Sequence, residues 1–264
     1  MPEPLTESAV VSRLRAAGCV FAEDEARLIL TTARTPDDVR TMVERRVAGL
    51  PLEHVLGWAE FCGMRIAVGP GVFVPRRRTE FLVREAAALL PPRPVVVDLC
   101  CGSGALGAVL LSGLRGGADD AVLHAVDIDP AAVRCARRNL DLLGGRVYEG
   151  DLFDPLPDAL RGRVDVLLAN VPYVPTGDIG LMPPEARDHE PRVALDGGED
   201  GLGVLRRVTA EAARWLAPGG RLLFEVGEGQ VPDAAAAVKR GGLAATVSTS
   251  DEFHATVIVG TKSV

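Results

Sequence analysis

The sequence predicts an α/β protein with a mostly parallel, doubly wound sheet, to which a small helical N-terminal region is joined. Two observations carry this prediction. Short apolar runs alternate with helix-like segments from about residue 95 onward, and the first fifty residues show helical periodicity instead. The strand-like runs are VVVDLC, VLHAVDI, RVYEGD, VDVLLAN and RLLFEV. Strands that alternate with helices are typical of a parallel sheet with helices on both faces.

The N-terminal region carries the start and stop signals of three helices. The first is predicted between Thr6, which can cap it, and Gly18. The second is an amphipathic run over residues 22–33. The third opens with Thr35-Pro36-Asp37-Asp38, a capping residue followed by a proline and two acids that suit the first turn of a helix, and it ends near Gly49.

The chain divides into three predicted parts, which cover residues 1–57, 58–74 and 75–264. The first is the helical region; the sequence leaves open whether it docks a macromolecular substrate or only stabilises the fold, and docking is the role we assign to it. The second contains EFCGMRIAVGPGVFV, whose alternation and Gly-Pro-Gly step predict a β-hairpin linker. The third ends in AATVST and HATVIV, which predict an antiparallel hairpin at the sheet edge.

The 264-residue chain has the composition of an ordinary globular protein, with 47% hydrophobic and 25% charged residues. No run approaches the roughly 20 apolar residues needed to cross a bilayer, and the N-terminus lacks the features of a signal peptide. A net charge of −7 argues against a protein that mainly binds a phosphate backbone. The five cysteines show no CxxC spacing and the four histidines no metal-ligand spacing. We therefore expect a cytoplasmic monomer with no metal site, no membrane contact and no stable nucleic-acid partner.

A glycine-rich loop follows the first strand of the sheet, in VVVDLCCGSGALG. Gly102 and Gly104 would let the backbone approach a ligand at the carboxyl end of the strand, where open α/β sheets bind ligands. The second strand ends at Asp127, about twenty residues beyond the loop, where an acid can accept hydrogen bonds from ribose hydroxyls. The third strand ends in GDLF and adds Asp151 beside the same cleft. This order favours a cofactor that contains adenosine, although Gly107 completes a GxGxxG spacing that also fits NAD.

The segment LLANVPYVP places two prolines after an apolar strand. Proline cannot donate to a sheet ladder, and it forces the residue before it into extended geometry, so the strand must end near Ala169. Asn170, Val171, Pro172 and Tyr173 then form a stiff turn that presents an amide, a rigid backbone and an aromatic ring. Together with the acid of the third strand, this turn disfavours NAD.

These motifs resemble the HemK/PrmC family of protein-(glutamine-N5) methyltransferases, which act on peptide-chain release factors. The resemblance covers nearly the whole chain, and its most specific parts are NVPY and MPPEARDHEPRVALDGGEDGL. It implies a Rossmann-like class I fold, S-adenosyl-L-methionine as cofactor, and the glutamine of a Gly-Gly-Gln motif as substrate. The turn formed by Asn170, Val171, Pro172 and Tyr173 would hold the glutamine amide as the catalytic element. The resemblance assigns the cofactor site to Pro75, Thr79, Asp98, Cys100, Gly102, Ser103, Gly104, Asp127, Ile128, Asp151, Leu152 and Asn170.

Two departures from the family pattern concern the acceptor. The family's turn usually has two prolines, whereas Val171 stands in place of the first. The family's PRPETE, the element that closes over the methionine end of the cofactor, is PRRRTE in this chain, so that Arg77 and Arg78 replace a proline and an acid. The second change adds positive charge near the mouth of the cleft. We expect a divergent member of the family, whose protein target the sequence leaves open.

Two other functions remain compatible with the motifs. One is a nucleic-acid amino-methyltransferase of the adenine N6 type, because the lone pair of an adenine or cytosine amino group is delocalised as that of a carboxamide is, and such enzymes use similar turns. The net negative charge and the lack of a basic, aromatic-rich segment argue against this function. A non-catalytic module that binds S-adenosyl-L-methionine would keep the fold without turnover. Methylation of a protein glutamine is the function we predict.

Overall fold

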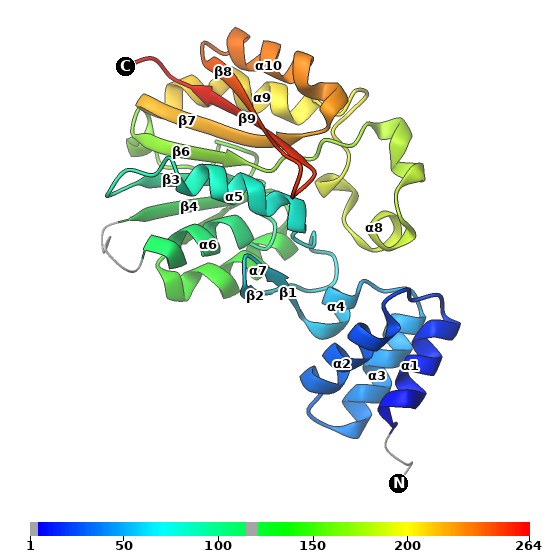
Figure 1. The fold of residues 1–264 in the computed structure, drawn as a ribbon. Helices are drawn as coiled ribbons and strands as arrows, with labels where there is room; N and C mark the ends of the chain where they lie inside the picture. The colour runs from blue at the N-terminus through cyan, green and yellow to red at the C-terminus, as the bar shows by residue number, and fades with distance from the viewer. Residues whose placement is uncertain (1–4, 115–120) are drawn as a thin grey trace.

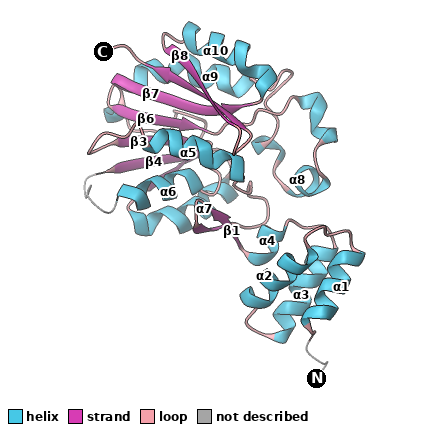
Figure 2. Ribbon diagram, viewed as in Figure 1, coloured by secondary structure: helices cyan, strands magenta, loops and turns pink. Residues whose placement is uncertain are grey.

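The computed structural model describes residues 5–114 and 121–264, so residues 1–4 of the predicted helical region lie outside it. Figure 1 shows a bundle of short helices at the N-terminus and a larger part in which helices flank a central sheet. In Figure 2 the long strands are gathered in this larger part. None of the helices in the described ranges combines the length and the apolarity that a membrane crossing requires.

The central sheet has seven strands in the order β5-β4-β3-β6-β7-β9-β8. Neighbours from β5 to β7 pair in parallel, whereas β9 pairs antiparallel with both β7 and β8. The bounds are β3 Val95–Leu99, β4 Val122–Asp127, β5 Arg146–Glu149, β6 Val164–Ala169, β7 Leu216–Val226, β8 Ala244–Ser250 and β9 Ala255–Thr261. The predicted doubly wound topology and the predicted edge hairpin are both confirmed.

Strand β7 is longer than the sequence pattern indicates. RLLFEV predicts a strand that starts at Arg221, but β7 begins at Leu216, and its register against β6 shifts between Val164 and Val166. Within this first half Gly219 has φ 75°, in the left-handed region that favours glycine. A strand with such an irregularity loses the period-two alternation by which strands are recognised.

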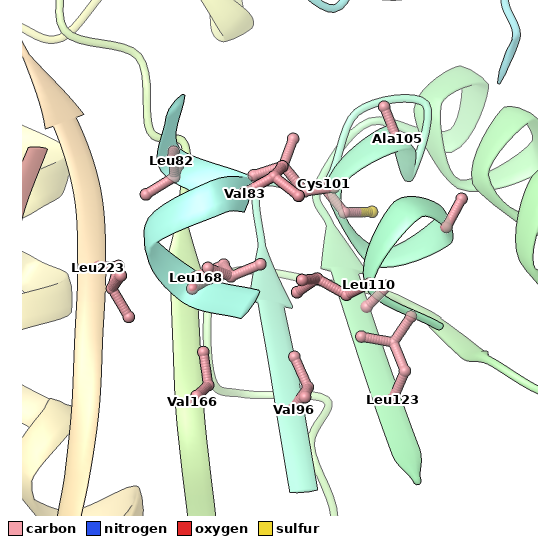
Figure 3. Close-up of a cluster of buried hydrophobic side chains, with 14 of the residues drawn as sticks. Leu82, Val83, Val96, Cys101, Ala105, Leu110, Leu123, Val166, Leu168 and Leu223 are labelled. Atoms are coloured by element: carbon pink, nitrogen blue, oxygen red, sulfur yellow. The ribbon is translucent and has the colours of Figure 1, made fainter. Parts of the chain in front are cut away.

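Alternate residues of the strands supply the two faces of the sheet. Val96 belongs to an apolar cluster that includes side chains of α5, α6 and α7, whereas its neighbour Val97 belongs to a cluster that includes α9 and α10. The bounds are α5 Glu80–Ala87, α6 Ala105–Leu114, α7 Pro130–Leu140, α9 Gly203–Trp215 and α10 Val231–Arg240. Figure 3 shows side chains of the first cluster, among them Leu82 of α5 and Leu168 of β6. Both faces are therefore covered.

The N-terminal bundle confirms the predicted helix signals. Its helices are α1 Glu7–Ala16, α2 Ala22–Thr32, α3 Pro36–Val47 and α4 Leu52–Leu56. Thr6 caps α1 by accepting a hydrogen bond from Ala9 N. Thr35 and Asp38 form a capping box at the start of α3, where Pro36 occupies the first turn. The bundle has an apolar core of its own, in which Leu14 and other side chains are fully buried.

An ion pair between Arg46 and Glu185 connects this bundle to the larger part. Arg46 of α3 binds Glu25 of α2 through Nε–Oε2 and Nη2–Oε1 contacts of 2.6 and 2.9 Å. Its Nη1 donates to Glu185 Oε1 at 2.6 Å, and Glu185 lies in α8 (Pro184–His189). We call these three side chains the Arg46 clasp. Arg46 and Glu25 are nearly inaccessible, whereas the Glu185 side chain, which makes the contact to α8, is 47% exposed.

The predicted hairpin is formed by β1 (Trp58–Phe61) and β2 (Met64–Ala67), which pair antiparallel. Asn139 of α7 holds the end of β2: its Oδ1 accepts from Ala67 N and its Nδ2 donates to Ala67 O, both at 2.9 Å. The same Nδ2 donates to Ser103 O in the glycine loop at 2.8 Å. One side chain thus ties the hairpin to the loop where the sequence predicts the cofactor.

Candidate active site

The glycine loop runs from the end of β3 into α6 and adopts backbone angles that suit glycine. Gly102 and Gly104 have φ of 55° and 75°. A Cβ on Gly102 would meet no atom within 4 Å, so this residue borders open space. A Cβ on Gly104 would lie 2.9 Å from Leu140 Cδ1 and 3.3 Å from Ala136 Cα. Gly102 therefore leaves room for a ligand, while Gly104 allows α7 to pack closely.

Asp127, the last residue of β4, holds the loop in place. Its Oδ2 accepts from Gly102 N at 2.8 Å and its Oδ1 from Asp129 N at 2.9 Å. Burial raises the pKa of this carboxyl, and the backbone amides that it binds oppose the shift. The Asp127 carboxylate thus holds the loop at Gly102, the residue that borders open space.

Asp98 lies in β3, directly before the loop, and is completely buried. Neither side-chain oxygen has a hydrogen-bond partner among the described residues, although the amide of Gly107 lies close enough to favour the charged form. Burial raises the pKa of Asp98 to about 7. A buried carboxyl without a partner costs stability, and such groups are concentrated at functional sites.

The predicted turn begins directly after β6, which ends at Ala169 as the prolines require. Asn170 is half-buried, and its side chain has no hydrogen-bond partner among the described residues. Tyr173 is fixed at both ends: its hydroxyl lies 3.3 Å from Glu225 Oε1, and its carbonyl accepts from Gln230 Nε2 at 2.9 Å. The turn thus presents a free amide beside a positioned aromatic ring.

One cavity joins the loop and the turn, with about 1000 Å³ of empty space that is partly open to solvent. The sequence-predicted residues that line the cavity are Pro75, Thr79, Cys100, Gly102, Ser103, Asp127, Ile128, Asn170, Val171, Pro172 and Tyr173. The structure therefore brings the predicted cofactor loop and the predicted acceptor turn into one space.

Four predicted residues do not line this cavity. Asp98 lies beneath the loop, and Gly104 packs against α7. Leu152 is buried with φ 47°. Asp151 follows Gly150, whose amide donates to Asp127 O, but its carboxylate is paired with Arg207 at 2.6 Å. Asp151 is thus near the edge formed by β4 and already has a cationic partner.

Glu225 of β7 is a site residue that the sequence pattern did not single out. It is 3% exposed and accepts a hydrogen bond from Thr79 Oγ1 at 2.9 Å, while its Oε1 lies 2.7 Å from Arg78 Nε. Burial raises the pKa of Glu225, and Arg78 opposes that shift. Through Thr79 and Tyr173 this carboxylate links the segment after the hairpin to the turn. The sequence feature that could have identified Glu225 is its place inside an apolar strand, RLLFEV, because a buried carboxylate needs a hydrogen-bonding or cationic partner.

The sheet order and a cavity at the carboxyl ends of adjacent parallel strands are those of a Rossmann-like fold. Residues 63–181 match the family described as Methyltransferase small domain. A methyltransferase from Pyrococcus furiosus superposes with a TM-score of 0.57 over 77% of this chain and 91% of its own, at 16% identity. The 16S rRNA N2 G1207 methyltransferase of T. Thermophilus, solved with AdoMet and guanosine, gives a TM-score of 0.54 over 78% and 49%, at 21% identity. These two likenesses show the fold.

Relatives in sequence narrow the class. The release factor glutamine methyltransferase of Geobacter sulfurreducens is 38% identical over 223 residues, which are 84% of this chain and 76% of the relative. That of Streptomyces coelicolor is 41% identical over 200 residues, or 72% and 69% of the two chains. The 4-amino-L-phenylalanine/4-methylamino-L-phenylalanine methyltransferase of Streptomyces pristinaespiralis is 39% identical over 207 residues, or 76% and 69%. The chain belongs to the release factor glutamine methyltransferase family, which confirms the predicted resemblance.

Proposed function

We propose that the protein transfers a methyl group from S-adenosyl-L-methionine to the side-chain amide nitrogen (N5) of a glutamine in a peptide-chain release factor. The observation that carries the proposal is the shared cavity, in which the glycine loop and the Asn170 turn face the same space. The relatives named release factor glutamine methyltransferase support the choice of acceptor. Their activity in translation also supports a cytoplasmic location, and we propose that the chain works as a monomer.

The residues of the loop region fit this cofactor. Gly102 leaves open space beside its backbone, where a ligand can approach, and Asp127 offers a carboxylate suited to ribose hydroxyls. Asp98 offers a buried carboxyl group that has no protein partner in the described chain. When bound, S-adenosyl-L-methionine supplies a methyl group on a cationic sulfur. We assign the cofactor-binding role to these residues together with Pro75 and Thr79, which line the same cavity.

The Asn170 turn would prepare the acceptor. A carboxamide nitrogen is a poor nucleophile because its lone pair is delocalised into the carbonyl. Asn170 Oδ1 and the backbone carbonyl of Val171 would accept its two N–H groups, which orients the nitrogen, and the Tyr173 ring would pack on the amide plane. Fixed orientation of reactants can lower a barrier by about 7–11 kcal/mol. No base is needed before transfer, because the product can release its proton afterwards.

Asp127 gives a first prediction. We expect Asp127→Ala to weaken cofactor binding by about 1.5–3 kcal/mol, because hydrogen bonds to a charged acceptor are lost. The loss of the bonds to Gly102 N and Asp129 N will also lower the free energy of unfolding, but by less. Titration calorimetry with S-adenosyl-L-methionine, beside urea unfolding, measures both. Equal effects on binding and folding would make Asp127 a residue that only shapes the loop.

The N-terminal helices provide a candidate docking surface for the protein substrate. Val20 and Phe21, between α1 and α2, are 83% and 69% exposed. They border a hollow that is also lined by Leu52 and by Glu185 of α8. Large apolar side chains that are exposed next to one another are typical of protein–protein interaction sites. We therefore propose that residues 1–57 dock the release factor.

The docking role predicts a difference between two acceptors. The double change Val20→Ser and Phe21→Ser should lower kcat/KM for the intact release factor by about tenfold, which corresponds to a loss of about 1.4 kcal/mol of contact energy at the docking surface. It should leave kcat/KM for a short Gly-Gly-Gln peptide unchanged. Val247→Ser, at a 47% exposed position on β8, is the matched control. A parallel loss on both acceptors would assign the effect to the fold.

The proposed function is tested with purified release factor and labelled cofactor. Mass spectrometry should find one added methyl group on the glutamine of the Gly-Gly-Gln peptide. A methyl group elsewhere in the release factor, or on RNA only, would exclude the proposed acceptor. Cofactor binding without turnover on any acceptor would leave a binding module.

A second acceptor is favoured by a specific observation. The relative from Streptomyces pristinaespiralis is named for a free aromatic amino acid, and it is as similar to this chain as the release factor enzymes are. An aryl amine also offers a planar nitrogen whose lone pair must be aimed at the methyl group. Incubation of the enzyme with 4-amino-L-phenylalanine in place of release factor tests this candidate. Turnover of this amino acid without turnover of release factor would replace the first proposal.

A further inference from the structure

The segment DGGEDGLG, residues 196–203, lies beside the chain that leaves the Asn170 turn. Val174 N donates to Leu195 O at 3.1 Å, and Gly197 N donates to Val174 O at 2.9 Å. These bonds form a parallel β-bridge. The turn is therefore supported by a segment to which the proposed function gives no role.

Two glycines of this segment pack directly on the backbone of the turn. A Cβ on Gly197 would lie 2.7 Å from Pro172 O, and a Cβ on Gly201 would overlap Tyr173 O. Gly201 also has φ 76°, in the left-handed region that favours glycine. A side chain at either position would push the turn away, so the segment fixes where the carbonyls of Pro172 and Tyr173 lie.

Gln230 joins the segment to the turn. Its Nε2 donates to Tyr173 O at 2.9 Å and to Asp200 O at 3.1 Å, and its Oε1 accepts from Gly227 N at 3.1 Å. Both hydrogens of the side-chain amide are thereby used, so Gln230 holds the turn, the segment and the residue after β7 in one arrangement. We call Gly201 and Gln230 the turn brace.

The turn brace occupies one carbonyl of the turn and leaves another free. Tyr173 O is bound by Gln230, whereas Val171 O has no donor among the described residues. Pro172 lies between these two carbonyls and its ring fixes φ, so a fixed Tyr173 also restricts the direction of the Val171 carbonyl. This carbonyl is the one to which we assign a hydrogen bond from the acceptor amide.

We propose that Gln230 is a positioning residue for methyl transfer. With Gly201 it holds the backbone of Tyr173, and through Pro172 it aims the Val171 carbonyl at the acceptor amide. The inference rests on the proposed function, because it assumes that the turn binds that amide. Neither residue of the turn brace lines the cavity, so we expect an effect on the transfer step and none on cofactor affinity.

Gln230→Glu removes the donor and keeps the acceptor. The introduced carboxylate still accepts from Gly227 N, but it faces the carbonyls of Tyr173 and Asp200 without a hydrogen. The single-turnover rate with saturating cofactor and release factor should fall by on the order of 100-fold, the cost of a small misplacement of reacting groups. Cofactor affinity should stay unchanged. Glu228→Gln, at an exposed position in the same turn of the chain, is the matched control.

The pH dependence of this variant tests the donor itself. Protonation of the introduced carboxyl returns one hydrogen for the Tyr173 carbonyl. The ratio of the Gln230→Glu rate to the wild-type rate should therefore rise as the pH falls toward the ordinary pKa of a glutamate, about 4.3.

Gly201→Ala tests the turn brace from its other side. Its Cβ would overlap Tyr173 O, so the variant should lower the transfer rate as Gln230→Glu does. Gly198→Ala is the matched control, because Gly198 also has a left-handed φ, of 92°, but a Cβ there would meet only Gly203 Cα, at 4.0 Å. It carries a similar backbone strain without contact to the turn, and its transfer rate should stay near that of the wild type.

A spectroscopic measurement reports on the turn without turnover. Tyr148 and Tyr173 are the two tyrosines of the chain, so protein labelled with 3-fluorotyrosine gives two fluorine resonances, which Tyr148→Phe assigns. Gln230→Glu and Gly201→Ala should shift the Tyr173 resonance and leave the other in place, since the Tyr148 hydroxyl lies 2.9 Å from His124 Nδ1 instead. Thermal unfolding of each variant identifies any general loss of the fold.

The outcomes separate the turn brace from the proposed function. A shifted Tyr173 resonance with slower transfer and unchanged cofactor affinity is the expected result. Transfer at the wild-type rate by folded Gln230→Glu at neutral pH overturns the positioning role and leaves the proposed function standing, and so does an equal loss of transfer and cofactor affinity. A wild-type enzyme that methylates no glutamine overturns the proposed function, and the positioning role with it.

Discussion

Asn170→Ala should lower the single-turnover rate of methyl transfer by on the order of 10²–10³-fold, the usual cost of removing one positioned hydrogen-bonding group from a reacting centre. Asn170 is the first residue after β6, and its side chain has no partner in the described chain, so the change breaks no bond that supports the fold. Its loss should therefore appear in the chemical step while cofactor affinity stays nearly constant. Rapid-quench assays with saturating acceptor, beside cofactor titration, separate the two effects.

Val171→Pro is the matched control for this prediction. It restores the proline of the family pattern two residues beyond the last residue of β6, and Pro172 already holds Val171 in extended geometry. The backbone carbonyl that would accept from the amide remains. Val171 is 2% exposed, so we expect a small loss of packing and nearly unchanged transfer. Robust transfer by Asn170→Ala would show that the segment is only a turn.

Asp98→Asn should stabilise the cofactor-free protein, and more so as the pH rises. The pKa of Asp98 is about 7 in the folded chain and about 3.9 in an unfolded one. The unfolded chain releases this proton near pH 4, whereas the buried carboxyl keeps it up to about pH 7, so the wild-type free energy of unfolding falls between these two pH values. Above pH 7 the loss approaches about 4 kcal/mol at most, and a neutral amide avoids it. Below pH 4 the two proteins should differ little.

Urea unfolding of both proteins at pH 4 and pH 8 checks this prediction. Asp178→Asn, a change at an exposed acid, gives the effect of charge removal alone. A cationic cofactor would favour the ionised form of Asp98, so cofactor binding near pH 7 should release protons in the wild type and fewer in the variant. Parallel stability curves for wild type and Asp98→Asn would show that burial does not hold the proton.

The sequence predicted those parts of the structure that depend on local physics. Thr6 and Thr35 cap helices because the bonds that they accept come from residues three positions away. The prolines end β6 at Ala169 because they act on their own backbone and on the residue before. Apolar alternation gave the remaining strands of the sheet, and the glycine loop and the turn then met because both follow the carboxyl ends of adjacent parallel strands.

The parts that escaped prediction depend on contacts between distant residues. Glu225 lies 146 positions from Thr79, and Asp151 lies 56 positions from its partner Arg207. No periodicity or spacing encodes such pairs, because the sheet order decides which side chains meet. The pairing also changes the expected chemistry: Asp151 was predicted as a cofactor ligand, and the structure gives it a competing cation. Its cofactor role stays a prediction.

The Arg46 clasp affects the design of chimaeras that join the N-terminal helices of one family member to the methyltransferase domain of another. Glu185 of α8 depends on an arginine that the N-terminal helices supply, and a few residues later Glu190 pins Arg76 and accepts from Val74 N. A chimaeric protein whose residues before 58 come from another family member would need a cationic side chain at the place of Arg46 to pair with Glu185. Without one, Glu185, whose side chain is 47% exposed, would lose its ion pair to the bundle. The bundle and α8 therefore share one ion pair, and a recombinant of family members should keep Arg46 and Glu185 together.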